Sequence, residues 1–372
     1  MINPQLSEEA VLWAYRMILG REPENAYVVR DHLQHVDSLA ALRKRFLDSS
    51  EFLESKSGDS RDKARGLESR CTVKLGADEA TTNKLVEHIA ESWHELGQTE
   101  PYWSVLSAPD FKMERIGETR NEFLESGRLE IERLFATLRR CGIEPVPEWE
   151  VFELGCGLGR ITRWLAKEFQ GIIACDISAS HLDLARELNA DTPGFSKIRW
   201  QQLRSPADVA TLPRFDLFFS VIVLQHNPPP VIAMLLEQIA ARMREGGIAY
   251  FQVPTYQRDY YFDAKQYLRS RAGTEGIEMH MLPQAEVFRI FLKHGCEPLE
   301  VYEDELSGSR ATQRSNTFVF RKVSDGAAAQ DLSSLAMEAE HAKLQTELAR
   351  IRHRLRWIPF LLPPNPATVN KD

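Results

Sequence analysis

The chain has 372 residues, of which 43% are apolar and 27% charged, and its formal net charge is −8. These values suit a globular protein of two or three domains, and they offer no overall positive field for a nucleic-acid backbone. The five cysteines include no C-x-x-C pair, so we expect reduced thiols rather than a disulfide framework or zinc ribbon. The start lacks a signal-peptide pattern and no apolar run reaches about 20 residues, so we expect a cytoplasmic protein.

Residues 1–54 are expected to form a small helical module. Apolar side chains repeat at helical spacing in three runs, at 12–19, 28–33 and 39–47. The segment from Tyr15 to Pro23, together with that from Phe46 to Phe52, resembles a helical module of bacterial surface and polysaccharide-related proteins that is related to phycobilisome linkers. That family usually has Gly and Trp in its second helix, which this chain lacks.

Residues 55–77 are expected to be a linker, because the segment begins with a stretch rich in Ser, Gly, Lys, Asp and Arg. Residues 78–149 carry two helical patterns with an aromatic stretch between them. Tyr102, Trp103 and Phe111 in that stretch either pack the helices, which we favour, or cover a ligand site.

Short apolar strands alternate with amphipathic helices between residues 150 and 324, which predicts an α/β fold with a doubly wound, mostly parallel sheet of seven strands. Strands are expected at 151–154, 171–175, 198–200, 215–224, 248–253, 299–302 and 317–320. The run 215–224 is almost purely apolar, as expected of a strand buried on both faces.

Residues 325–372 are expected to form a helical tail with a Pro-rich end. Apolar residues recur there every seven positions, at Met337, Leu344, Ile351 and Ile358, which is a short coiled-coil pattern. The tail is either a solvated helix, the slightly favoured interpretation, or a segment that meets an anionic membrane surface or a partner coil. In the second case the protein would be peripheral to the inner membrane.

The most informative segment is Glu153-Leu154-Gly155-Cys156-Gly157-Leu158-Gly159-Arg160, which follows a predicted strand and opens a helix. Glycine lets the backbone turn sharply and approach a ligand. Asp176 ends the next strand, where a carboxylate can accept hydrogen bonds from both ribose hydroxyls of a nucleoside. A dinucleotide fingerprint needs G-x-G-x-x-G, whereas Arg160 stands here in place of the last glycine. Glu153 is placed to help hold a cation.

Residues 118–322 resemble a class I S-adenosylmethionine-dependent methyltransferase. The segment 153–160 is similar to the first motif of that family, Asp176 to its acidic second motif, and 215–220 to its fourth. The resemblance implies S-adenosylmethionine as cofactor, and the expected cofactor-binding residues are Glu153, Gly155, Cys156, Gly157, Gly159, Arg160, Asp176, Ile177, Gln202 and Ser220. The third motif often has an acidic residue for the adenine amino group, for which Gln202 or a backbone group would have to serve here.

His226 is the candidate catalytic residue, because it lies just past the predicted fourth strand, at the edge where ligands of such sheets lie. Its neutral imidazole could take a proton from a substrate hydroxyl, or it could merely cap the loop before Pro228. His280 and Met281 either line an acceptor pocket or are ordinary loop residues.

Neither a metal nor a nucleic acid is expected at this site. Gln225-His226-Asn227 stands where catechol-type members carry acidic Mg²⁺ ligands. The sequence Asn227-Pro228-Pro229 is followed by Pro230, which offers no ring to stack on a flipped base.

The expected function is methyl transfer from S-adenosylmethionine to a small-molecule or saccharide acceptor, with O-methylation as the expected chemistry. The N-terminal resemblance suggests bacterial surface polysaccharide biosynthesis. The alternative is a catalytically idle, methyltransferase-like scaffold that binds a partner through its end modules. A nicotinamide-dependent oxidoreductase is a third interpretation, and it would need a glycine in place of Arg160.

Overall fold

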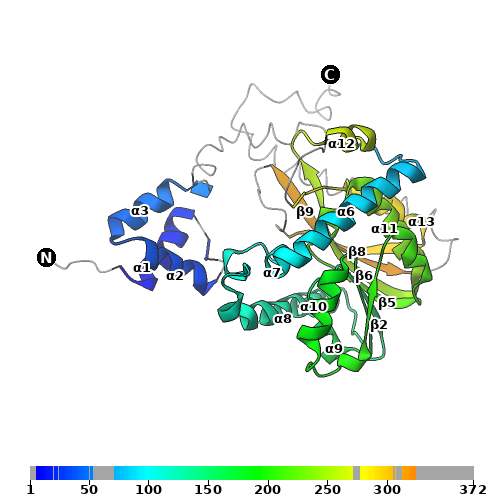
Figure 1. Ribbon diagram of the computed structural model, residues 1–372, viewed down its shortest axis with the longest axis horizontal. Coiled ribbons are helices and arrows are strands. Elements are labelled where there is room, and N and C mark those ends of the chain that lie inside the picture. The colour runs from blue at the N-terminus through cyan, green and yellow to red at the C-terminus, as the bar shows by residue number, and fades with distance from the viewer. Residues whose placement is uncertain are drawn as a thin grey trace, which may run out of the picture.

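The computed structural model describes residues 6–19, 21–23, 25–49, 51–52, 71–270, 277–304, 306 and 312–323. The predicted tail and coiled coil at 325–372, and most of the predicted linker, lie outside these residues. Figure 1 shows the N-terminal helices beside a larger α/β body. Among the described residues, no helix is long and apolar enough to cross a membrane.

The N-terminal module contains the three predicted helices, α1 (Glu8–Ala14), α2 (Ala26–His35) and α3 (Leu39–Leu47), and a π-helical turn (Tyr15–Leu19) continues α1. Each helix begins where Ser or Asn accepts a hydrogen bond from a backbone N–H of the first turn, a standard N-cap. The helices bury a small apolar cluster of their own: Val11, Tyr15, Val29, Leu42 and Phe46.

The predicted seven-stranded sheet is confirmed. Its strands are β2 (Glu150–Leu154), β3 (Gly171–Asp176), β4 (Ile198–Gln202), β5 (Phe215–Ser220), β6 (Met243–Gln257), β8 (Cys296–Glu303) and β9 (Gln313–Lys322). The order across the sheet is β4-β3-β2-β5-β6-β9-β8, and the pairs from β4 to β6 are all parallel. Only β9 runs against its neighbours within this sheet.

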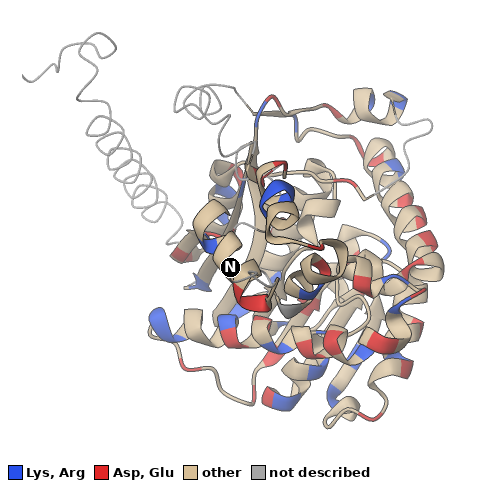
Figure 2. Cartoon of the chain, turned by 90° about the vertical axis from the view of Figure 1, so that its left-hand side faces the viewer, with Lys and Arg blue, Asp and Glu red and all other residues tan. Residues whose placement is uncertain are grey.

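Helices cover both faces of the sheet. One face packs against α8 (Ile116–Arg140), α9 (Thr162–Glu168) and α10 (Ala179–Asn189). The other packs against α11 (Pro229–Arg242) and α13 (Gln284–Lys293). Neighbouring residues of β2 point to opposite faces of the sheet, as the alternation of a strand requires. Val151 packs in the apolar cluster beneath α8, α9 and α10, and Phe152 packs in the apolar cluster beneath α11 and α13. Figure 2 shows Lys and Arg interspersed with Asp and Glu along the helices of the side that carries the N-terminal module.

Two predicted boundaries are wrong. The strand expected at 215–224 ends at Ser220, because Ile222 has a φ of 60° and a 3₁₀ turn occupies Leu224–His226. The predicted linker contains strand β1 (Thr72–Val73), which pairs in parallel with β7 (Tyr261–Phe262) beside α12 (Ala264–Ser270). Part of the linker therefore belongs to the α/β body.

Candidate active site

A pocket lies at the carboxyl ends of β2, β3 and β5, where ligands of open α/β sheets bind. Its empty space is about 1040 Å³, a volume that includes open solvent. Helices α6 (Glu79–Thr99) and α7 (Pro101–Val105) contribute residues to its lining. Figure 1 shows α6 crossing in front of the sheet toward α7 and α10.

The glycine loop after β2 forms part of the wall. Gly155, Gly157 and Gly159 have φ values of 72°, 51° and 73°, a region that favours glycine. A Cβ on Gly157 would lie 2.8 Å from a methyl group of Val105, so the missing side chain lets α7 close on the loop. Gly159 does not line the pocket, and a Cβ there would meet Asn189. The turn at Gly159 packs against α10, and its predicted contact with a cofactor stays a prediction.

Asp176 lies at the end of β3 and lines the pocket, as predicted. One carboxylate oxygen accepts the backbone N–H of Gly157 at 2.8 Å, and the other accepts that of Ser178 at 2.9 Å. These bonds fix the carboxylate against the glycine loop. Since an ionised carboxylate offers about four lone-pair positions, two remain for further donors.

Glu153 and Arg160 are charged residues buried in the pocket wall. Glu153 is 2% exposed and accepts the hydroxyl of Thr162 at 2.6 Å. Burial raises the pKa of Glu153 to about 7. Arg160 is 5% exposed, and while Nη1 donates to Ser126 at 3.2 Å, its buried Nε has no partner among the described residues. The pocket wall thus contains a carboxyl group that resists ionisation and a buried guanidinium group.

Two further predicted contacts do not reach the pocket. Gln202 donates to the carbonyl of Ile177 at 3.0 Å, and Ser220 donates to that of Leu154 at 3.1 Å. Both side chains therefore tie strand ends together, and their predicted contacts with a cofactor stay predictions. Ile177 lines the pocket as predicted, and Leu203 is the residue after β4 that does so.

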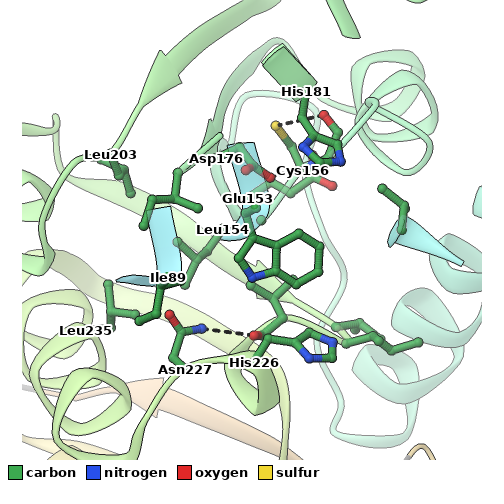
Figure 3. A pocket seen from close by; sticks show the side chains of 18 of the residues that line it. Ile89, Glu153, Leu154, Cys156, Asp176, His181, Leu203, His226, Asn227 and Leu235 are labelled. Carbon is green, nitrogen blue, oxygen red and sulfur yellow. Dashed lines mark hydrogen bonds between the residues drawn. The ribbon is translucent and has the colours of Figure 1, made fainter. Parts of the chain in front are cut away.

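His226 lines the pocket on the side away from the carboxylates. Figure 3 shows Glu153, Asp176 and His181 together, with His226 and Asn227 across from them. Nδ1 of His226 lies 2.8 Å from the carbonyl oxygen of Glu278, which can only accept, so Nδ1 carries the proton. Burial lowers the pKa of His226 to about 4. The ring is therefore neutral near pH 7, with Nε2 as its accepting nitrogen.

The sequence did not single out several pocket residues, among them Trp93 of α6, Ser104 of α7 and His181 of α10. The ring of Trp93 lies 5.2 Å from that of His226 and 6.1 Å from that of His181, between centroids. Nε2 of His181 lies 2.9 Å from Oγ of Ser104, whose hydroxyl donates to the carbonyl of Pro101. This bond connects α7 to the sheet body beside the pocket.

The predicted aromatic alternatives are settled by packing. Tyr102 is buried against Phe123, with Phe111 on the same ring, so these aromatics pack helices as we favoured. Neither Trp103 nor Phe111 lines the pocket.

His280 and Met281 do not line the pocket either. Nδ1 of His280 lies 2.8 Å from the hydroxyl of Tyr260, and Nε2 lies 3.0 Å from a carboxylate oxygen of Glu278. Met281 is buried with its sulfur 3.3 Å from that of Cys71. His280 therefore contacts Glu278, whose carbonyl oxygen faces His226, and Met281 packs against Cys71.

Comparison with known proteins shows which domain this site belongs to. Residues 151–247 match a family model described as a methyltransferase domain. Over these residues the chain is similar to that family, in line with the predicted methyltransferase domain. The match does not reach the N-terminal helices, whose resemblance to phycobilisome linkers stays a prediction.

Individual relatives are more distant. A methyltransferase of Aspergillus novofumigatus is 31% identical over 162 residues, which cover 42% of this chain and 59% of that protein. The chain therefore spans about three fifths of that relative. Magnesium protoporphyrin IX methyltransferase of Synechocystis, solved with bound S-adenosylhomocysteine, is 14% identical with a TM-score of 0.44, over 63% of this chain and 99% of that one. Phosphoethanolamine N-methyltransferase 1 of Haemonchus contortus is 15% identical with a TM-score of 0.44, over 71% and 55%.

Proposed function

We propose that this protein transfers the methyl group of S-adenosylmethionine to a hydroxyl group of a small molecule. One observation carries the proposal: a single pocket is lined by the buried acidic side chains of Glu153 and Asp176, by Arg160 and by the neutral imidazole of His226. These charges suit a ligand that joins a nucleoside to an amino acid.

The pocket residues fit S-adenosylmethionine group by group. Asp176 keeps lone pairs for the two ribose hydroxyls, and Ile177 and Leu203 offer an apolar surface for adenine. The amino-acid end carries an ammonium and a carboxylate. Glu153 can accept from the first, and the guanidinium group of Arg160, which also lines the pocket, provides a positive charge for the second.

When bound, S-adenosylmethionine supplies an electrophilic methyl carbon on a positively charged sulfur. With S-adenosylmethionine bound, pocket walls that held an acceptor hydroxyl in line with that carbon would remove a large part of the barrier. Nε2 of His226 would take the hydroxyl proton while the oxygen gains the methyl group and the sulfur keeps the electron pair of the broken carbon–sulfur bond. A positioned base accelerates a reaction by about 10²- to 10⁴-fold. Because the pKa of His226 is about 4, its imidazole is a weak base, and we expect an acceleration toward the lower end of that range.

The lining of the pocket favours an acceptor with an apolar body. Apolar side chains reach it from α6, the loop after β4 and α11: Val86, Ile89, Trp93, Leu203, Pro206, Val231 and Leu235. A saccharide would bring many hydroxyls to walls that offer few partners, and each unpaired polar group costs binding energy. A role in surface polysaccharide synthesis would rest on the N-terminal resemblance alone.

Calorimetric titration with S-adenosylmethionine separates an enzyme from the idle scaffold. We expect one site per chain, strongly weakened in Asp176→Asn and unchanged in Asp216→Asn. Asp216 is a matched control, because it also accepts a backbone N–H, that of Glu150, but lies outside the pocket lining. Absence of binding to the folded wild-type protein would overturn the proposal. Transfer of a labelled methyl group to a panel of phenols and aliphatic alcohols then tests the acceptor class.

A further inference from the structure

A chain of buried amide groups leads to His226. The backbone N–H of Ile222 donates to Oε1 of Gln252 at 2.9 Å. Nε2 of Gln252 donates to Oε1 of Gln225 at 3.0 Å and to Ser315 at 2.6 Å. Nε2 of Gln225 lies 3.4 Å from Nε2 of His226. The chain therefore joins the pocket wall at Ile222 to the imidazole through two glutamine side chains.

The direction of this chain is fixed at its start. A backbone N–H can only donate, so the oxygen of Gln252 must face Ile222 and its NH₂ group must face Gln225. The oxygen of Gln225 is then occupied, and its NH₂ group faces His226. A nitrogen that meets this donor must accept. The carbonyl oxygen of Glu278 requires a protonated Nδ1, so the contacts at Nε2 and at Nδ1 both require the Nδ1–H tautomer of His226.

The backbone of Ile222 and the burial of the two amides show that this hydrogen-bond arrangement costs conformational and desolvation energy. Ile222 is β-branched and yet has a φ of 60°, a left-handed conformation that such residues rarely adopt. Strain of this kind persists where neighbouring groups hold it, and it clusters at functional sites. Gln252 is fully buried and Gln225 nearly so, which disfavours amides unless their hydrogen bonds are made. Ile222 and His226 both line the pocket.

We propose that Gln252 and Gln225 are positioning residues that hold His226 as its Nδ1–H tautomer, so that Nε2 is the nitrogen that accepts the substrate proton. The inference rests on the proposed role of His226 as a base. At 3.4 Å the contact from Gln225 is longer than a strong hydrogen bond. An acceptor hydroxyl can therefore displace it and make a shorter bond to Nε2.

Long-range proton–nitrogen correlation spectra of the ¹⁵N-histidine-labelled full chain report the tautomer without any acceptor. The signals of His226 are identified by their loss in His226→Asn. In the wild type at pH 7.5 we expect a protonated Nδ1 and an unprotonated Nε2. Gln225→Glu places a carboxylate oxygen at Nε2, and we expect Nε2 to become protonated. Gln252→Met frees the Gln225 amide to turn, and we expect the single tautomer to be replaced by a mixture.

Gln257→Met is the matched control. Gln257 of β6 and Gln313 of β9 form another glutamine pair, at 3.3 Å, and neither lines the pocket. We expect it to leave the His226 signals unchanged. A wild-type His226 with its proton on Nε2 overturns the inference, as does a Gln252→Met chain that keeps the pure Nδ1–H form. The base role fails separately, if His226→Asn turns over at the wild-type rate while the spectra are as expected.

Discussion

Binding of S-adenosylmethionine should release a proton from Glu153. The carboxyl group is buried, and desolvation outweighs the hydrogen bond from Thr162 and the charge of Arg160, so its pKa rises to about 7. An ammonium group beside it would favour the ionised form. The cofactor should therefore bind the carboxylate and expel the proton that the free protein holds.

The size of the effect follows from that pKa. At pH 7 about half of the free protein carries the proton, so about half a proton should leave per site filled. The release should approach one proton per site near pH 6 and should fall to about a tenth of a proton per site near pH 8. The same raised pKa makes the folded state bind more protons than the unfolded state between about 4.5 and 7. The free protein should thus lose up to about 3 kcal/mol of stability as pH rises through this window.

Calorimetric titrations at pH 7 in two buffers of different ionisation enthalpy measure the protons released. The difference in heat should correspond to about half a proton for the wild type and to none for Glu153→Gln. Glu150→Gln is the control, because Glu150 lies on the same strand but pairs with Arg199 outside the pocket. Equal heats in both buffers for the wild type, or proton uptake, would refute the role given to Glu153.

Three further predictions follow from the pocket. Asp176→Ala should weaken S-adenosylmethionine binding by about 2–3 kcal/mol, or 30- to 150-fold, and a loss below about threefold in calorimetry would show that the carboxylate points elsewhere. Gly97→Ala should lower the free energy of unfolding by about 1–3 kcal/mol in urea titrations, because a Cβ there would meet Ser180 and lie 2.6 Å from Nδ1 of His181 on α10. An unchanged midpoint would mean that α6 is free to shift. At saturating S-adenosylmethionine, where Glu153 is already ionised, the rate of methyl transfer should be independent of pH above about 5, because the pKa of His226 is lowered to about 4, and an inflection between pH 6 and 7 would count against His226 as the base.

The sheet and the glycine loop could be predicted from the sequence because both depend on local patterns. Apolar runs of strand length and a glycine triplet after one of them need no knowledge of distant residues. The end of β5 could not be found this way. Ile222 is apolar like the strand before it, and its left-handed backbone depends on a hydrogen bond to Gln252, 30 positions away.

At the candidate site, too, the direction in which side chains point depends on residues far away in the sequence. Gln202 and Ser220 stand where cofactor contacts occur in related motifs, but their side chains bond to backbone carbonyls of neighbouring segments. The direction of a side chain at a strand end depends on such partners rather than on its position in the motif. Trp93 and His181 reach the pocket from helices that carry no motif, so only the packing of α6 against α10 reveals them.

The most direct test is a crystal structure of the protein with S-adenosylhomocysteine. We expect the ribose hydroxyls on Asp176, the amino group at Glu153 and the carboxylate at the guanidinium group of Arg160. The sulfur should then face the part of the pocket lined by His226 and Trp93. A nucleoside bound elsewhere, or a sulfur directed away from His226, would contradict the assignment of this pocket to methyl transfer.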